Sequence, residues 1–488
     1  MSCKHFWRKY HKWGGIILAF FMIMFCLSGI ILNHRSLFTH AEISRKYLPE
    51  NYKIKNYNNG IIKGTIAINK KQILAYGSNG IWLTDHKLTN IEPFNNGLEK
   101  GADNRHICNL VKMHNGKIVC AGLYDAYMLT GNTWRKINIQ KKAHYDRIAD
   151  ITAKGDSLII LTRNEIFISE NFNPFTRYTL PTPDGYSNKV SLFKTLWQLH
   201  SGALFGIAGR IFVDLIAGIT ILLCITGITE TVCKSSIKRR HRRLKKAKGW
   251  ISAMVKSVKI HYKVGTSLFV FFLITTISGT CLRPPLMVPL VLVKTSPLPL
   301  TSLDNRNVFF DKLRAIRWDE SINKWIISTS DGFYQTDLMN DKPQKMRNAP
   351  EVSPMGINCF SHINNDTWII GSFSGLSEWN TKTGAVRQIM GKTTGHMPIA
   401  DVAVAGYSAD IYDGTVFDYF KGALSKYPVR PMKKEMTYLP LSLWNTALEV
   451  HTGRIFKFLL GPLSVLYIFI FGTAIILVFI SGWKIHKM

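Results

Sequence analysis

Residues 11–29 read HKWGGIILAFFMIMFCLSG, and residues 261–279 read HYKVGTSLFVFFLITTISG. Each stretch opens with a histidine, continues as an apolar run and closes with a Ser-Gly pair 17 positions after the histidine. A run of this length is sufficient for a helix that crosses a bilayer. The recurrence of one unit indicates a membrane protein that contains a tandem duplication.

Four apolar segments are long enough to span a membrane. They cover residues 14–32, 207–228, 265–282 and 459–480. The first does not read as a cleaved signal peptide, because its core is long and Asn33-His34-Arg35 follows it without a small-residue cleavage site. We expect it to be a retained membrane span.

The formal net charge of +31 is concentrated beside the predicted spans. Residues 229–263 are dense in Lys and Arg and contain one acidic residue, Glu230. Further basic residues lie before the first span and after the last, as the positive-inside rule expects of cytoplasmic segments. We therefore expect both termini and the basic loop to be cytoplasmic and in contact with the lipid bilayer. Nucleic acid is not an expected partner, because no nucleic-acid-binding fold accompanies the charge.

The duplication extends beyond the first match. Residues 78–85, SNGIWLTD, return as SDGFYQTD at 330–337, and His200-Ser-Gly returns as His451-Thr-Gly. A [Ser/Thr]-Gly pair recurs toward one end of every span: Ser28-Gly29, Thr226-Gly227, Ser278-Gly279 and Ser481-Gly482. Each half therefore reads as span, outer segment, span, and the halves are parallel repeats related by an axis along the membrane normal.

The two outer segments have the pattern of all-β structure, with short β-branched or aromatic runs separated by Gly, Asn and Asp. About three hairpin pairs occur in each half, each of about the size of a propeller blade. Because three blades would leave open sheet edges, we expect one propeller of about six blades shared by both halves. Two separate β-domains are the alternative. A disulfide between Cys108 and Cys120 is left open.

The predicted fold is thus a four-helix transmembrane bundle with an outward-facing all-β domain. The expected segments are the N-terminus and first span (1–34), a periplasmic β segment (35–195), the second span (196–229), a basic cytoplasmic loop (230–260), the third span (261–283), a second periplasmic β segment (284–445) and the fourth span with a cytoplasmic tail (446–488).

Four histidines at span ends occupy equivalent places in the two halves. His11 and His261 begin spans at the cytoplasmic face, and His200 and His451 precede spans at the outer face. A twofold axis would bring each pair together inside the bundle, where facing imidazoles can serve as axial ligands of haem iron. We predict two b-type haems and one-electron transfer from a cytoplasmic or membrane donor to an outside acceptor. The alternative places these histidines in an interfacial aromatic belt. The sequence leaves open which histidines pair.

Three further residues are candidates for a role at the predicted haem sites. His34 is a less favoured ligand of the outer haem, because its counterpart in the second half is Pro284. Arg210 and Asp214 lie four apart on one helix face. Charge inside a membrane indicates function, so Arg210 is a candidate to hold a haem propionate; a mutual ion pair with Asp214 is the alternative.

The stretch RKYHKWGGIILAFFMIMFCLSGIILNHR, with LHSGALFGIAGR and VHTGRIF, resembles the PepSY-associated transmembrane family. The resemblance covers the four spans. It implies that His11, His200, His261 and His451 are haem ligands, and that the chain resembles inner-membrane reductases that use b-type haem to reduce ferric siderophores in the periplasm. The partner would be a ferric chelate or a periplasmic siderophore-binding protein.

A second class of function needs no haem. In this alternative the chain is a non-enzymatic membrane sensor or assembly protein whose propeller binds a ligand. The colour of the purified protein separates the two hypotheses, because a b-type haem protein is red.

Overall fold

The computed structural model describes residues 3–141, 146–364, 366–391 and 402–487. The chain divides into two compact units. The membrane unit comprises residues 1–38, 187–305 and 443–488, and the β unit comprises residues 39–186 and 306–442. Each unit is therefore assembled from both halves of the duplication.

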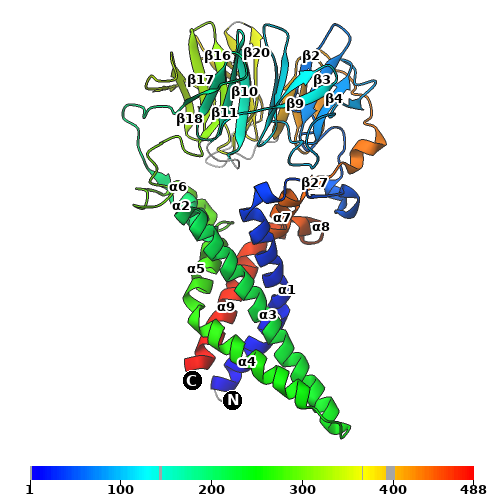
Figure 1. The fold of residues 1–488 in the computed structure, drawn as a ribbon, viewed down its shortest axis with the longest axis vertical. Helices are drawn as coiled ribbons and strands as arrows, with labels where there is room; N and C mark the ends of the chain where they lie inside the picture. Colours follow the sequence, from blue (N-terminus) through cyan, green and yellow to red (C-terminus); the bar gives the residue numbers. More distant parts are fainter. Residues whose placement is uncertain (1–2, 142–145, 365, 392–401, 488) are drawn as a thin grey trace. The chain divides into compact units, whose positions relative to one another are not determined.

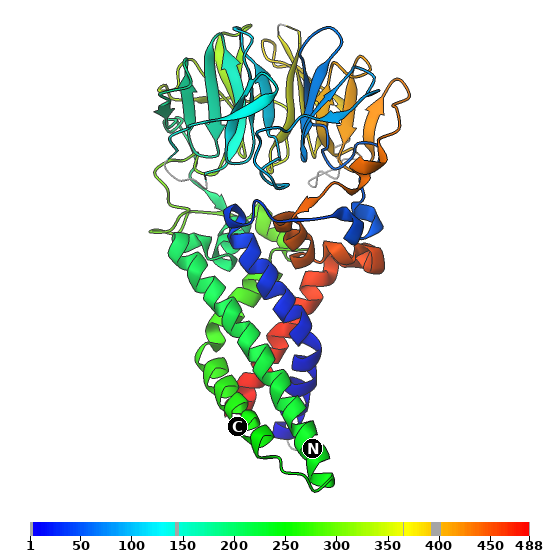
Figure 2. The ribbon, with the colours of Figure 1, turned by 45° about the vertical axis from the view of Figure 1, so that its right-hand side comes forward.

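The membrane unit is helical (Figures 1 and 2). Its helices are α1 (Cys3–Asn33), α2 (Leu192–His200), α3 (Gly206–Arg242), α4 (Lys248–Ser267), α5 (Phe269–Thr280), α6 (Met287–Leu292), α7 (Leu443–His451), α8 (Lys457–Leu460) and α9 (Tyr467–Lys487). Within the described residues, three helical stretches are long and apolar enough to cross a membrane: His5–Asn33, Ala203–Arg242 and Arg454–Lys487. Large apolar side chains such as Phe20, Ile211 and Ile470 are exposed on them, as expected of surfaces that face lipid.

The third predicted span is a broken helix. Helices α4 and α5 meet at Leu268 with a bend of 67°, and together they pass the same test of length and hydropathy. The residues predicted as a basic loop, 230–260, are largely helical, because α3 continues to Arg242 and α4 begins at Lys248. Lys and Arg are good helix formers, and cations at the C-terminal turn of α3 complement the helix dipole.

The fourth span is interrupted near Pro462. The short helix α8 ends at Leu460, and a 3₁₀ segment covers Gly461–Leu466 before α9 begins. Proline cannot donate the backbone hydrogen bond of a helix interior, so the chain adopts this tighter turn with Pro462 at its start. The added turn separates His451 from α9.

In the described part of the β unit, six antiparallel sheets of three or four strands are each made of strands consecutive in the chain. The first half supplies β2 (Gly64–Ala67), β3 (Ile73–Gly77), β4 (Gly80–Thr84), β5 (Glu92–Pro93); β6 (Asn109–Lys112), β7 (Ile118–Ala121), β8 (Ala126–Thr130), β9 (Thr133–Ile137); and β10 (Ile148–Lys154), β11 (Ser157–Thr162), β12 (Ile166–Ser169), β13 (Thr176–Tyr178). The second half supplies β16 (Leu313–Asp319), β17 (Lys324–Thr329), β18 (Gly332–Thr336), β19 (Gln344–Lys345); β20 (Ile357–Asn364), β21 (Thr367–Ser372), β22 (Gly375–Asn380), β23 (Val386–Met390); and β24 (Val404–Ser408), β25 (Thr415–Asp418), β26 (Gly422–Ser425).

The first strands of the sheets contact one another in a closed series. Strand β2 contacts β6, and the contacts continue through β10, β16, β20 and β24 back to β2. Each interface between neighbouring sheets also holds its own buried apolar cluster. The described β structure therefore has no single central core, and its stability is distributed over these interfaces.

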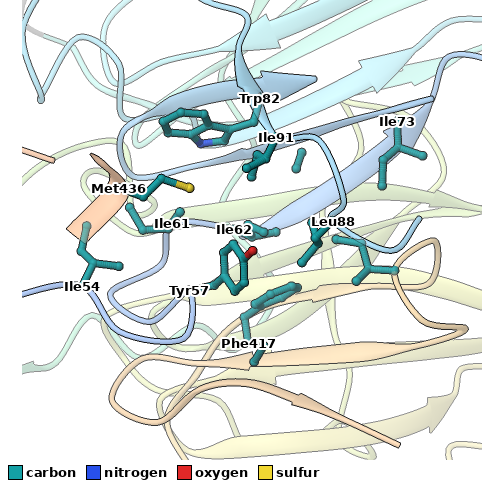
Figure 3. Close-up of a cluster of buried hydrophobic side chains, with 13 residues drawn as sticks. Ile54, Tyr57, Ile61, Ile62, Ile73, Trp82, Leu88, Ile91, Phe417 and Met436 are labelled. Carbon is teal, nitrogen blue, oxygen red and sulfur yellow. The ribbon is translucent and has the colours of Figure 1, made fainter. Parts of the chain in front are cut away.

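One cluster joins the beginning of the β unit to its end (Figure 3). Tyr57, Ile61 and Trp82 from the first half pack with Phe417 and Met436 from the second. Burial of an Ile or Phe side chain contributes about 1.5–3 kcal/mol each. This packing brings together segments that lie more than three hundred residues apart in the sequence.

Two short strand pairs also join the halves. In the β unit, β1 (Glu42–Ile43) pairs with β27 (Leu441–Ser442), and in the membrane unit β14 (Val190–Ser191) pairs with β15 (Lys294–Thr295). Cys108 and Cys120 do not form the disulfide that the sequence left open.

Candidate functional site: two facing histidine pairs

The membrane unit brings His11 and His261 together. His11 lies in α1 and His261 in α4, and their ring centroids are 6.0 Å apart with the ring planes at 74°. We call these two residues the inner pair. The two positions are equivalent in the repeat, although the sequence left open which histidines pair.

His200 and His451 form a second pair, the outer pair. They are the last residues of α2 and α7, with ring centroids 6.1 Å apart and an interplanar angle of 51°. Gly202 and Gly453 follow them in the left-handed region, at φ +75° and +73°. Glycine adopts this conformation without a steric penalty, so each short helix can end directly after its histidine.

The Nδ1 atom of each histidine is engaged by a neighbouring helix. The carbonyl partners of Nδ1 are Val478 for His11 (3.1 Å), Leu223 for His261 (3.0 Å) and Thr275 for His200 (2.9 Å). Nδ1 of His451 lies 2.9 Å from the Ser28 hydroxyl, and the Phe25 backbone also accepts from the His451 ring. A carbonyl can only accept, so Nδ1 carries the proton, and Nε2 keeps its lone pair. All four histidines thus present the same nitrogen as a potential ligand.

The [Ser/Thr]-Gly pairs explain this repeated arrangement. Each accepting carbonyl lies three residues before the Ser or Thr of such a pair. The hydroxyl groups of Ser481, Thr226 and Ser28 lie 2.9–3.0 Å from Nδ1 of His11, His261 and His451, respectively. Each of these hydroxyls donates to a carbonyl of its own helix, which leaves its oxygen to accept from the imidazole.

The glycine of each pair provides room for the imidazole. A Cβ atom added at Gly279 would lie 2.6 Å from Cε1 of His200, and one at Gly482 would lie 3.0 Å from Cε1 of His11. The corresponding distances are 3.4 Å at Gly227, from His261, and 3.5 Å at Gly29, from His451. The four motifs are evident in the sequence, but their contact with the histidines was not predicted. The presence of one [Ser/Thr]-Gly pair for each of the four histidines could have indicated this contact.

Each histidine is held by the opposite half of the duplication. His11 belongs to the first half and contacts Ser481 of the second, whereas His261 belongs to the second and contacts Thr226 of the first. The outer pair follows the same rule, with Thr275 for His200 and Ser28 for His451. Neither half of the duplication can therefore supply both a histidine and the residues that hold it.

His34 does not join the outer pair in this structure. Its Nε2 lies 2.6 Å from Oδ2 of Asp214, and the Asn33 side chain donates to Oδ1 of Asp214 at 2.9 Å. Asp214 is thus bonded to the Asn-His sequence at the end of α1, and among the described contacts it forms no ion pair with Arg210. The mutual ion pair that the sequence left open is not the observed arrangement.

A charged residue that the sequence analysis did not single out lies near the outer pair. Arg283 interacts electrostatically with His451, Arg454 and Glu449. Arg454 is paired with Glu449 at 2.5 Å. Arg283 directly precedes Pro284, the counterpart of His34, and comparison of the repeats at that position could have identified it.

Aromatic side chains occupy the bundle beside the outer pair. The Phe25 ring lies 5.7 Å from that of His451 and 5.9 Å from that of Tyr467, which also contacts Phe21 and Phe471. The Tyr467 hydroxyl is buried and has no hydrogen-bond partner in the structure. Within the described residues, no group of three or more His, Cys, Asp or Glu is arranged to hold a metal ion.

Comparison with solved structures gives only weak similarity. The extracellular domain assigned to a hybrid two component system from B. thetaiotaomicron is 9% identical, with a TM-score of 0.35, and the match covers 75% of this chain and 32% of that one. A related one component system domain from the same organism gives the same identity and score, with 82% and 47% coverage. The chain therefore spans about a third to a half of the length of these proteins.

No curated protein sequence matches the chain. The family described as PepSY-associated TM region matches residues 1–229 and 167–486. These matches include all four histidines of the two pairs. The chain belongs to the PepSY-associated TM region family.

Proposed function

We propose that the protein transfers electrons across the bacterial inner membrane through two b-type haems and reduces a ferric siderophore, or a similar iron chelate, in the periplasm. His11 and His261 would hold the inner haem, and His200 and His451 the outer one. The single observation that carries this proposal is the pair of facing imidazoles at two levels of the membrane unit, each with Nδ1 engaged and Nε2 available.

The spacing of the rings supports axial ligation. An imidazole nitrogen binds a metal at about 2.0–2.1 Å, and the ring centroid lies roughly 1.1 Å behind that nitrogen, so two ligands facing across one metal have centroids about 6 Å apart. The observed separations are 6.0 and 6.1 Å. Hydrogen bonds from Nδ1 to carbonyls fix ring orientation and increase the basicity of the ligand, as is common around metal-bound histidine.

The positions of the pairs along α1 support one site near each face. His11 belongs to the inner pair, and Ser28, 17 residues later on the same helix, holds His451 of the outer pair. At ~1.5 Å per residue this separation is roughly 25 Å, close to the ~30 Å thickness of the hydrocarbon core. When bound, two b-type haems, held by the imidazoles of the two pairs, would supply one-electron transfer.

Other features of the membrane unit are consistent with a bulky group. A Cβ at Gly15 or Gly206 would meet nothing within 4 Å, so backbone at these positions is open to close approach. The unpartnered Tyr467 hydroxyl is available to donate to a group from outside the chain. Arg283 and Arg210 offer positive charge that suits a propionate.

The proposed topology follows the positive-inside rule. Both termini and the basic junction between α3 and α4 would be cytoplasmic, and the β unit would be periplasmic. The bundle would have four spans, with α4 and α5 as one bent span. The closed series of contacts between first strands supports a six-bladed propeller shared by both halves.

Spectroscopy in the presence of a ferric chelate tests this function. We expect the full-length protein, purified in nanodiscs, to show b-type absorbance bands that sharpen on dithionite reduction. Addition of a ferric siderophore under anaerobic conditions should restore the oxidised spectrum. The gallium complex of the same siderophore is the matched control, because it has the same ligand but cannot accept an electron.

The outcomes separate the parts of the proposal. Reoxidation by the ferric complex and not by the gallium complex supports it. A reduced spectrum that no ferric chelate reoxidises would overturn the assigned acceptor. A folded, colourless protein would overturn the haem proposal and favour a sensor or assembly role.

A further inference from the structure

A polar cavity of about 220 Å³ lies within the β unit, where the first strands of five sheets converge. Its lining comes from residues in or next to β2, β6, β10, β16 and β20, together with Tyr76 of β3. Both halves of the duplication contribute to it. No part of the electron-transfer proposal uses this cavity, and the inference below holds with or without that proposal.

Positive charge predominates in the lining. Lys63, Arg314 and Arg317 line the cavity, and Asp150 is the one acidic residue among the described lining residues. Asp150 Oδ2 accepts from Arg317 and from the Ile316 backbone. Because Asp150 is paired with Arg317, it does not offset the charges of Lys63 and Arg314.

Further hydrogen bonds hold the Asp150–Arg317 pair in place. Asn109 donates to Oδ1 of Asp150 at 2.9 Å, and Tyr76 donates to Asn109 at 2.6 Å. Arg317 Nε donates to the Phe360 carbonyl at 3.1 Å. This network joins residues of β3, β6, β10, β16 and β20, so the cavity wall is preorganised by contacts within the chain.

Arg314 has incomplete internal partners. One terminal nitrogen donates to the backbone carbonyls of Asp311 and Leu313, both at 3.0 Å. Its Nε is buried and has no hydrogen-bond partner in the structure. A buried guanidinium N–H is normally satisfied, so this group indicates an acceptor supplied from outside the chain.

The carboxylates near Arg314 are shared with other cations. Of the nearby carboxylates, Asp311 is paired with Arg163 at 2.7 Å and Asp331 with Lys312 at 2.9 Å. Burial lowers the pKa of Arg314, Asp311 and Asp331 raise it, and the neighbouring Arg147 lowers it. An anion in the cavity would relieve both of the lowering effects.

We propose that this cavity binds a small oxyanion with at least two negative charges, either phosphate or a short di- or tricarboxylate. Arginine presents a planar set of donors that matches both groups. The volume is below the ~300–1,000 Å³ typical of pockets for drug-sized ligands, which argues against a complete ferric siderophore. Lys63, whose Nζ lies 2.8 Å from Nε2 of His106, provides the second positive charge.

Isothermal titration calorimetry of the full-length protein in detergent tests the proposal. Inorganic phosphate, succinate and citrate are titrated separately at constant ionic strength, with chloride as the background anion. We expect saturable binding of at least one of them at millimolar or lower concentration. The anion that binds most tightly shows whether the cavity prefers phosphate or a carboxylate. Arg314→Gln and Lys63→Gln should each weaken this binding by about tenfold or more.

Arg387→Gln is the matched control, because Arg387 is exposed, pairs with Glu378 and does not line the cavity. Its binding should equal that of the wild type. Thermal unfolding of every variant is measured first, and if Arg314→Gln does not fold, Lys63→Gln decides the result. The proposal is overturned if no anion binds to the wild type, if folded cavity variants bind as tightly, or if the control loses affinity equally.

Discussion

The inner and outer histidine pairs both lie against the [Ser/Thr]-Gly segments of neighbouring helices, but the two pairs are carried by different structures. His11 and His261 lie inside long helices, whereas His200 and His451 are the final residues of nine-residue helices that end at glycine turns. The position of an inner histidine is therefore set by a whole span. The position of an outer histidine depends on a short helix and on the glycine that ends it.

The pairs also differ in how closely the imidazoles are packed. At the outer pair, the glycine opposite His200 leaves much less room than the glycine opposite His451, 2.6 against 3.5 Å for an added Cβ. At the inner pair the two distances, 3.0 and 3.4 Å, are more alike. The same [Ser/Thr]-Gly motif therefore leaves unequal room for a Cβ atom at its four positions, and His200 is the most closely confined of the four imidazoles.

Removal of an outer ligand should have the largest effect. We expect His200→Ala to lower the haem content from two per protein to one, because one axial ligand of the outer site is lost. His34→Ala should keep two, because His34 is bonded to Asp214. Pyridine haemochrome assays of both purified variants check this pair, and equal loss in both would show that His34 is a ligand after all.

Glycine substitutions test the unequal confinement directly. Gly279→Ala places a methyl group 2.6 Å from the His200 ring, and overpacking of this kind costs about 1–3 kcal/mol. We expect loss of the outer haem or a clear change in its spectrum. Gly29→Ala, at 3.5 Å from the His451 ring, should leave haem content and spectrum unchanged. Similar behaviour of the two variants would refute the packing argument.

Loss of a hydroxyl acceptor should have the smallest effect. In Ser481→Ala, His11 retains the Val478 carbonyl, so we expect a loss of only about 1 kcal/mol in site stability and two bound haems. A redox titration should show a small shift confined to the inner haem. Loss of that haem would instead make the hydroxyl essential for ligation.

Part of this arrangement was predictable because a duplication constrains equivalent positions. The repeat made His11 equivalent to His261 and His200 equivalent to His451, while the sequence left open which histidines pair. The contact of each histidine with a [Ser/Thr]-Gly pair did not follow from the repeat, because it joins residues as far as 470 positions apart and depends on how spans from opposite halves pack.

In the β unit, too, some features could be predicted from the sequence and others could not. Alternating apolar residues and turn residues predicted three hairpin pairs in each half, and the structure has three sheets from each. The cavity could not be predicted, because its lining combines residues of β3 with residues in or next to the first strands of five sheets, and no local sequence pattern gives the order of these sheets around the unit. The bend at Leu268 was also missed, since no Pro lies in this part of the span.

The central claim is that each histidine pair holds one haem, and its most direct test is the haem-to-protein ratio of the wild type beside His11→Ala, His200→Ala and the double variant. We expect a haem-to-protein ratio of two in the wild type, one in each single variant and none in the double variant. A wild-type ratio of zero, or a double variant that keeps its haem, would contradict this claim.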